Sequence, residues 1–233
     1  MLKPGGIIVI PIGTETQSYI NTILLISTAL YLLPNFRLSA SLIFLAFKDL
    51  LQGLSYKNIE YGSSTYYLTV LSWIHISLQP FFVNLFISHF DKKFKYWNHI
   101  FFLCLLFSLF CILRLETFNI QNNKKCIKKN MKNDFCSNKT QSYIGKYHIG
   151  YQFSTDKYYS YAMIFYNLLM FIPGLFTKTK NLALSWGLGV LLIVLPLYNK
   201  IGTGEINAMW CFLSILFALP VALFHKKILL LIK

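Results

Sequence analysis

Two acidic side chains and one histidine lie inside long apolar stretches of the chain. Asp49 lies in FLAFKDLLQGL, His75 lies in VLSWIHISLQPFFVNLF, and Glu205 begins EINAMWCFLSILFALPVALF. A charge at the centre of a bilayer costs about 2.5–3.5 kcal/mol on insertion scales, so such residues usually face a protein interior and mark a functional site. Carboxylates and imidazoles are common general acids and bases, so these residue types suit proton transfer.

The spacing around Asp49 and His75 gives each of them a polar partner on the same helix face. Gln52 follows Asp49 by three residues and Gln79 follows His75 by four, and residues so separated are neighbours on an α-helix. We predict that Asp49 and His75 lie across one cavity, close enough to share a proton, a metal or a water. Asp49 and His75 are then the candidate catalytic residues, while Gln52 and Gln79 orient a ligand.

Three further polar residues are expected at the same depth and are assigned to ligand binding: Glu15, His148 and Glu205. His75 and Asp49 also have the chemistry of zinc ligands. The chain contains no His-x-x-x-His or Cys-x-x-Cys spacing, however. A lone intramembrane histidine more often hydrogen-bonds across helices, so a zinc site and a purely hydrogen-bonded site both stay open.

The composition is typical of a membrane protein. The 233 residues are 55% hydrophobic and only 13% charged, with a mean hydropathy of +0.52, whereas soluble domains average about 25% charged residues. The net charge is +14, but the lysines lie mostly between apolar stretches, which argues against nucleic-acid binding. The composition predicts one integral membrane domain over residues 1–233, with the lipid bilayer as its main partner.

Seven apolar stretches approach the length of about 20 residues that a helix needs to cross a bilayer. They cover residues 16–33, 38–56, 65–90, 96–115, 158–176, 182–198 and 206–224. The predicted fold class is therefore all-α: a polytopic membrane protein with a bundle of about seven transmembrane helices.

Charge asymmetry predicts which side of the membrane each end faces. An extracytoplasmic N-terminus and a cytoplasmic C-terminus place most basic residues of the short segments in the cytoplasm, as the positive-inside rule requires. The polar loop at about 116–157 is then extracytoplasmic, although it holds eight lysines. Cys126 and Cys136 are predicted to form a disulfide there, which needs an oxidising compartment. Asn138 begins an N-glycosylation sequon and is the predicted glycosylation site.

The other histidines and the cysteines of the apolar stretches receive simpler interpretations. The histidines at the predicted cytoplasmic boundary are interpreted as interfacial anchors: His89, His99 and His225. The cysteines are interpreted as small packing residues: Cys104, Cys111 and Cys211.

Four stretches of the chain are similar to the signature blocks of a known family. They are Asp49-Leu-Leu-Gln52, Leu-Ser-Trp-Ile-His75-Ile-Ser-Leu-Gln79-Pro80-Phe-Phe-Val-Asn84, Gly145-Lys-Tyr-His148-Ile-Gly-Tyr-Gln152 and Trp210-Cys211-Phe-Leu-Ser214. The chain resembles an uncharacterised seven-helix membrane protein family, a domain of unknown function found in bacteria and large DNA viruses. The resemblance implies seven helices and an outer polar cluster, but no activity. Asp49 and Gln152 stand where that family usually has glutamates, and the loop has fewer cysteines. These departures weaken the inference that the loop is a metal-binding or catalytic element in this chain.

Three classes of function fit these observations. The leading hypothesis is a membrane-embedded, hydrolase-like enzyme acting on a lipid or small amphiphile at the extracytoplasmic side. The alternatives are a proton- or cation-coupled transporter or channel with Asp49, His75 and Glu205 as its relay, and a ligand-binding receptor without catalysis. A transporter needs polar residues through both halves of the bundle. The inner halves are nearly all apolar apart from Asn84 and Ser88, which favours a cavity open to one side.

Overall fold

The computed structural model describes residues 14–62, 64–115, 137, 139–155, 159–194 and 202–232. Within these ranges the chain forms eight α-helices and one two-stranded antiparallel sheet. The helices are α1 (Glu15–Tyr31), α2 (Phe36–Glu60), α3 (Tyr66–Ser88), α4 (Trp97–Leu113), α6 (Tyr159–Leu175), α7 (Lys180–Val194), α8 (Thr203–Leu223) and α9 (His225–Ile232). The strands are β1 (Gln141–Ile144) and β2 (Ile149–Gln152).

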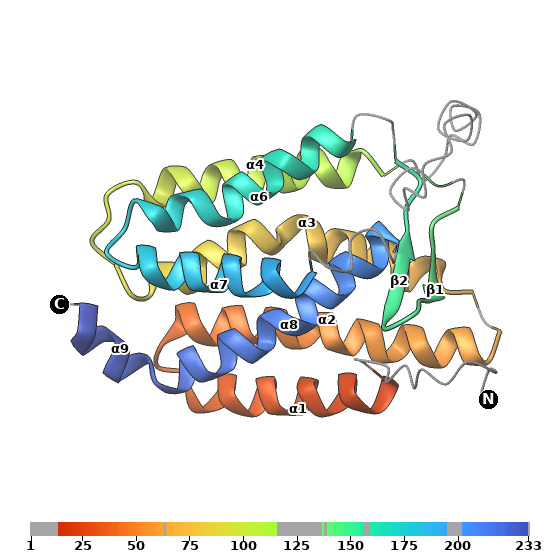
Figure 1. Cartoon of the computed structure of the whole chain (residues 1–233), viewed down its shortest axis with the longest axis horizontal. Helices are drawn as coiled ribbons and strands as arrows, with labels where there is room; N and C mark the ends of the chain where they lie inside the picture. Colours follow the sequence, from red (N-terminus) through yellow and green to blue (C-terminus); the bar gives the residue numbers. More distant parts are fainter. Residues whose placement is uncertain are drawn as a thin grey trace.

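The long helices lie side by side along the long axis of the molecule, as Figure 1 shows. The β1–β2 hairpin lies at one end of this bundle and α9 lies at the opposite end. Helix α2 contacts α1, α3, α8 and both strands. Any polar side chain on the inward faces of α2 is therefore surrounded by protein.

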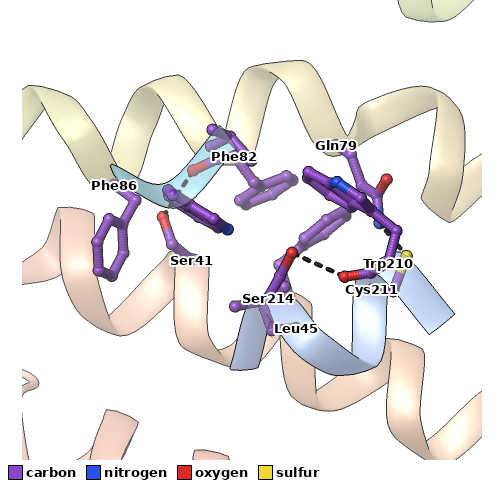
Figure 2. Close-up of a pocket in the computed structure, with 11 residues that line it drawn as sticks. Ser41, Leu45, Gln79, Phe82, Phe86, Trp210, Cys211 and Ser214 are labelled. Atoms are coloured by element: carbon purple, nitrogen blue, oxygen red, sulfur yellow. Dashed lines mark hydrogen bonds between the residues drawn. The ribbon is translucent and has the colours of Figure 1, made fainter. Parts of the chain in front are cut away.

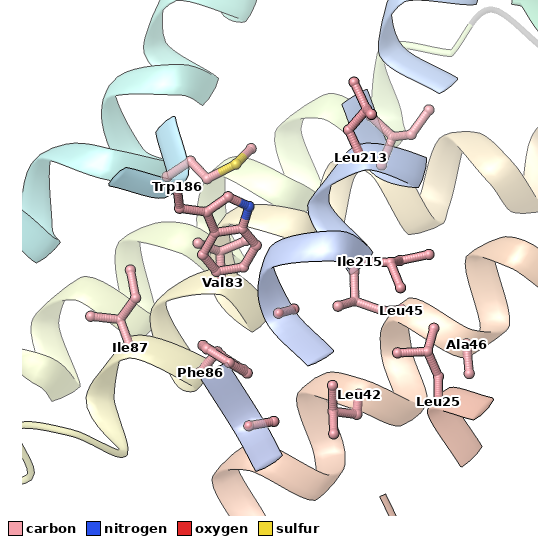
Figure 3. Packing of buried hydrophobic residues seen from close by; sticks show 14 of the residues in the cluster. Leu25, Leu42, Leu45, Ala46, Val83, Phe86, Ile87, Trp186, Leu213 and Ile215 are labelled. Atoms are coloured by element: carbon pink, nitrogen blue, oxygen red, sulfur yellow. The ribbon is translucent and has the colours of Figure 1, made fainter. Parts of the chain in front are cut away.

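Apolar side chains at helical spacing hold α2 in this central position. Leu42 and Ala46 are four residues apart on one face of α2 and are almost fully buried. They pack in the cluster that also contains Leu25 of α1 and Ile215 of α8 (Figure 3). This packing fixes the rotation of α2 and so determines where its polar residues point.

Three of the described helices are long and apolar enough to cross a membrane: α2, α3 and α8. The prediction of about seven spans is not supported, because α1, α4, α6 and α7 are only 15 to 17 residues long. A span needs about 20 residues. Several of these shorter helices still present large apolar side chains outwards, among them Ile23, Leu24 and Leu30 of α1 and Phe102, Leu105 and Leu109 of α4.

Part of the predicted 116–157 loop is an ordered element that packs into the end of the bundle. Strands β1 and β2 pair in antiparallel register, with Gln141 opposite Gln152 and Ile144 opposite Ile149. Tyr151 and Phe153 are fully buried, and β2 packs along α8. The description of this whole segment as a polar loop was therefore wrong for its last part, because strands of four residues leave only a weak alternation signal.

Candidate functional site

The centre of the buried polar cluster is a lysine that the sequence reasoning missed. Lys48 of α2 is almost fully buried. Its Nζ atom donates to the hydroxyl oxygen of Tyr151 at 3.1 Å and lies 4.3 Å from the centre of that ring. A buried charged lysine needs such partners, because removing an ammonium group from water is costly. Its position beside Asp49 in one apolar stretch was the available signal.

Gln52 joins the lysine to the carboxylate of Asp49. With its amide oriented to satisfy both neighbours, Gln52 donates from nitrogen to Asp49 Oδ1 at 3.1 Å and accepts from Lys48 Nζ at 3.2 Å. The Asn21 amide of α1 adds a hydrogen bond to the Asp49 side chain. The predicted neighbourhood of Asp49 and Gln52 is therefore present, with Lys48 and Asn21 as further members.

One oxygen of Asp49 has no hydrogen-bond partner among the described residues. Asp49 is 1% exposed, and its Oδ2 atom is buried without a hydrogen bond in the part of the chain that the structure describes. An unpaired buried carboxylate oxygen is unfavourable, because it has lost its hydrogen bonds with water and has no hydrogen bond with protein to replace them. This atom is the place in the cluster where a proton, a water or a ligand donor would add a bond.

His75 makes its contacts away from this carboxylate. Its Nε2 atom is bonded to the carbonyl oxygen of Phe44 at 2.8 Å, and its ring stacks on the Phe44 ring at 3.8 Å. Phe44 precedes Asp49 by five residues, which is about 7.5 Å along the axis of α2. The described contacts do not join His75 to Asp49, so their sharing of a proton or ligand stays a prediction. His75 Nδ1 is buried and unpartnered.

Gln79 extends the polar cluster from α3 to α6 and α8. Its nitrogen donates to Cys211 Sγ at 2.8 Å, and its oxygen accepts a hydrogen bond from the Tyr166 hydroxyl. Cys211 is fully buried and lies within electrostatic range of Lys48 and Asp49. The interpretation of Cys211 as a packing residue alone is too simple, because its sulfur accepts a hydrogen bond.

A small cavity lies next to this part of the cluster (Figure 2). Its polar lining comes from Ser41 of α2, Gln79 of α3, and Cys211 and Ser214 of α8, among aromatic side chains such as Phe82 and Trp210. The space open to the centre of a water molecule is about 10 Å³, which holds roughly one water. The polar lining therefore extends toward the end of the bundle that the sequence analysis expected to be apolar.

Glu205 of α8 and Tyr56 of α2 hold the hairpin against the helices, and both contact its residue His148. Glu205 Oε1 accepts from the backbone nitrogens of Tyr147 at 2.5 Å and His148 at 2.9 Å. The Tyr56 hydroxyl accepts from Ile149 N at 2.7 Å and lies 3.4 Å from His148 Nδ1. Glu205 and His148 come together as expected, but the described contacts are those of a fastening between hairpin and helices.

Two glycines allow this close approach of hairpin and helix. A Cβ atom at Gly204 would lie 1.9 Å from the carbonyl oxygen of Tyr151. A Cβ atom at Gly145 would lie 2.3 Å from the carboxyl carbon of Glu205. Neither distance is compatible with a side chain, so glycine at these positions is what permits β2 to bring Tyr151 to Lys48.

Replacing Glu205 with alanine is expected to release the hairpin. The change leaves two backbone N–H groups without an acceptor, at a cost of about 2–4 kcal/mol in the free energy of unfolding. Chemical denaturation and limited proteolysis of residues 137–155 in detergent measure the effect. Glu205→Gln is the matched control, because its amide oxygen still accepts both bonds. Equal stability and equal cleavage for Glu205→Ala and Glu205→Gln would contradict this role.

His148 should make the protein less stable in acid. Burial, and secondarily the charge of Lys48, lowers the pKa of His148 from 6.5 to about 3, although its hydrogen bond at Ile149 acts in the opposite direction. The folded ring therefore stays neutral while the unfolded chain takes up a proton below about pH 6.5. The stabilisation is complete above that pH and is lost as the pH falls toward 3, by about 1.4 kcal/mol per pH unit.

The control for this prediction is His148→Asn, whose amide can occupy the position of Nδ1 beside Tyr56 without titrating. The melting temperature of this variant should fall less steeply on acidification than that of the unsubstituted protein. Parallel pH curves for the two proteins would show that His148 contributes nothing to acid sensitivity.

The remaining predicted residues lie outside the buried cluster or outside the described residues. Glu15 is the first residue of α1 and is partly exposed, where its charge suits the positive end of the helix dipole. Cys126, Cys136 and Asn138 lie outside the described residues, so the disulfide and the glycosylation stay predictions. Across the described ranges, no three His, Cys, Asp or Glu side chains gather as a metal site requires.

A family model covers nearly all of this architecture. The model for DUF5765, a family of unknown function, matches residues 20–230, from α1 into α9. The chain belongs to this family. The match confirms the expected membership of an uncharacterised family, and its description assigns DUF5765 no activity. Comparison of the chain with curated proteins and with solved structures found no match.

Proposed function

We propose that this member of DUF5765 is a proton-coupled membrane transporter in which Asp49 binds the transported proton. The observation that carries the proposal is the buried Lys48–Gln52–Asp49 network in the middle of α2, with Asp49 Oδ2 unpartnered. Ionisable groups inside membrane bundles are rare and are typical of proton relays and ion pathways. Among the three classes of function, a transporter makes the most direct use of a buried lysine next to a buried carboxylate.

The two states of Asp49 differ in the net charge of the site. With Asp49 ionised, its negative charge offsets the positive charge of Lys48. With Asp49 protonated, one positive charge is left in a region from which water is excluded, and this state is costly unless the surroundings rearrange. Tyr151 is the partner of Lys48, so a change at Asp49 acts directly on the hairpin. Proton binding and movement of the hairpin are therefore coupled in this proposal.

The polar lining beyond Asp49 supports a path rather than a blind cavity. Cys211 and Gln79 continue from the charged pair, and Ser214 and Ser41 line the cavity farther along the bundle. Ser41 lies within two turns of the start of α2, which is the end opposite the hairpin. The hairpin covers one side and the cavity holds about one water, as in an occluded state of a transporter.

The same proposal includes the membrane topology. The helices α1 to α4 and α6 to α8 all cross the bilayer, with the hairpin end extracytoplasmic and the α9 end cytoplasmic. The basic residues at the α9 end support this orientation. The helices of 15 to 17 residues require a locally thinned bilayer, which costs only fractions of a kcal/mol per Å of mismatch.

The hydrolase-like alternative has less support from the geometry. A nucleophilic mechanism needs a hydroxyl or thiol within hydrogen-bond reach of a base. His75 is bonded to a backbone carbonyl, His148 lies beside Tyr56, and Cys211 accepts from an amide. Among the described residues, neither histidine is hydrogen-bonded to a serine, threonine or cysteine. The Tyr56 hydroxyl beside His148 already accepts from the backbone nitrogen of Ile149.

Proton flux into sealed vesicles tests the proposal. The purified protein is reconstituted into liposomes that contain a pH-sensitive dye, and a potassium diffusion potential drives protons inward. The proposal expects faster acidification than in protein-free liposomes, with or without a co-transported solute mixture. Flux no faster than in protein-free liposomes under both conditions would contradict it. Release of product from a fluorogenic lipid ester in place of flux would favour the hydrolase-like enzyme.

A further inference from the structure

A second polar cluster lies at the opposite end of the bundle from the hairpin. It consists of Arg37 in the first turn of α2, His89 at the end of α3, Lys92 in the turn that follows, and His225 at the start of α9. His89 and His225 are almost fully buried, so their interpretation as interfacial anchors was wrong. They are buried because α9 follows directly after α8 and brings His225 against the end of α3.

Contacts bring Arg37, His89 and His225 together, and the charge of Lys92 acts on His89 from the exposed turn beside it. The His89 and His225 rings meet edge to face with centres 5.4 Å apart. Arg37 Nη1 donates to the carbonyl oxygen of Ser88 at 2.8 Å, next to His89 in the chain. The other donors of this guanidinium have no partner among the described residues, although a guanidinium carries five N–H groups. Several charged donors beside the two histidines are therefore without a partner among the described residues.

One buried imidazole nitrogen of the cluster also has no hydrogen-bond partner among the described residues. His89 Nε2 is buried and makes no hydrogen bond, while His225 Nδ1 is bonded to the carbonyl oxygen of Ala222 at 2.8 Å. Burial is the main cause that lowers the pKa of His89 to about 4, and the charges of Lys92, His225 and Arg37 add to it. A bound anion would offset this accumulation of positive charge and supply an acceptor for Nε2.

Among the described residues, the charges that act on His89 all come from basic groups. Asp91 is the nearest carboxylate in the sequence of this turn, and its Oδ2 already accepts from the backbone nitrogen of Lys178 at 3.1 Å. At the start of α2 the backbone nitrogens of Leu38 and Ser39 donate to the carbonyl oxygen of Asn35, while the Asn35 side chain caps none of the N–H groups before them. Helix N-termini with free N–H groups favour phosphate oxygens.

We infer that Arg37, His89, Lys92 and His225 form a binding site for a phosphate group, carried by the headgroup of an anionic phospholipid or by a free phosphate. Arg37 supplies charged N–H donors, His89 supplies its unpartnered Nε2, and Lys92 supplies charge at the rim. This inference does not depend on proton transport.

The neighbouring helix α9 is suited to a lipid surface. It begins His225-Lys226-Lys227 and continues with Ile228-Leu229-Leu230-Leu231, and Leu230 and Leu231 are 70% and 86% exposed. Basic residues next to exposed leucines are typical of helices that lie in the headgroup region of a bilayer. A phospholipid at the cluster would place its acyl chains beside these leucines.

The test compares lipid retention and stability in nanodiscs of two compositions. One contains only phosphatidylcholine and the other includes phosphatidylglycerol, with native mass spectrometry and the melting temperature as readouts. The unsubstituted protein should retain phosphatidylglycerol and melt at a higher temperature in its presence. Arg37→Gln and His89→Phe should each weaken retention by about tenfold or more, because a charged or buried hydrogen bond is lost. His89→Phe keeps an aromatic ring for packing.

Lys180→Gln is the matched control, because it removes an exposed charge from the same end of the bundle and should retain the lipid. Stabilisation by inorganic phosphate in phosphatidylcholine nanodiscs supports the site and assigns it to free phosphate. The site is refuted if the unsubstituted protein responds to neither phosphatidylglycerol nor phosphate. It is also refuted if Lys180→Gln weakens retention as much as Arg37→Gln, since the effect is then one of net charge.

Discussion

Replacing Asp49 with asparagine is expected to abolish proton-driven acidification of vesicles while leaving the protein folded. The asparagine amide fills nearly the same volume and can keep a hydrogen bond with Gln52, whose contact with Asp49 Oδ1 is 3.1 Å. It cannot bind and release a proton at neutral pH. The proton flux should therefore fall to that of protein-free liposomes. The protein should still fold, with a lower melting temperature, because the buried Lys48 charge loses its counter-charge.

The matched control for this prediction is Glu60→Gln, which removes an exposed carboxylate from the same helix. Its flux should equal that of the unsubstituted protein. Normal flux through Asp49→Asn, with correct insertion verified, would exclude Asp49 as the proton-binding group.

Replacing Lys48 with methionine is expected to lower the free energy of unfolding by about 3–5 kcal/mol, because it leaves the buried Asp49 carboxylate without its counter-charge. Methionine preserves most of the length and apolar volume of the lysine side chain. The double variant Lys48→Met, Asp49→Leu should be more stable than Lys48→Met alone, since no unpaired charge then stays in the core. Denaturation in mixed detergent micelles provides these free energies.

Lys57→Met is the control for the loss of a lysine from α2, because Lys57 is exposed near the end of the same helix. It should change the free energy of unfolding by less than about 0.5 kcal/mol. The loss of unfolding free energy in the double variant is compared with the sum of the losses in Lys48→Met and Asp49→Leu alone. If the two are equal, Lys48 and Asp49 do not stabilise each other across Gln52.

The sequence predicted the α2 part of the site because helical spacing is a strong signal. Asp49 and Gln52 share a face, and both are buried among protein groups. Lys48 was missed because lysines in an apolar chain are usually boundary anchors. Only the long-range contact with Tyr151, which comes from a strand 103 residues farther along the chain, shows that this lysine is held in the interior.

The roles of Glu205 and His148 could not be predicted, because they too depend on contacts between the hairpin and distant helices. Chain direction placed both at one end of the bundle, and the structure brings them together. Their function in holding the hairpin depends on backbone N–H groups of a turn, which composition and periodicity do not reveal. The position of His225 depends likewise on how α9 follows α8, which places a predicted surface residue in the interior.

The most direct measurement of the central claim is infrared difference spectroscopy of the reconstituted protein between acidic and alkaline buffer. The account predicts a carbonyl stretching band from a protonated, buried carboxylic acid that appears on acidification and is absent in Asp49→Asn. Glu60→Gln should keep the band. A spectrum without any such band, or one in which the band persists unchanged in Asp49→Asn, would contradict the claim that Asp49 exchanges a proton inside the bundle.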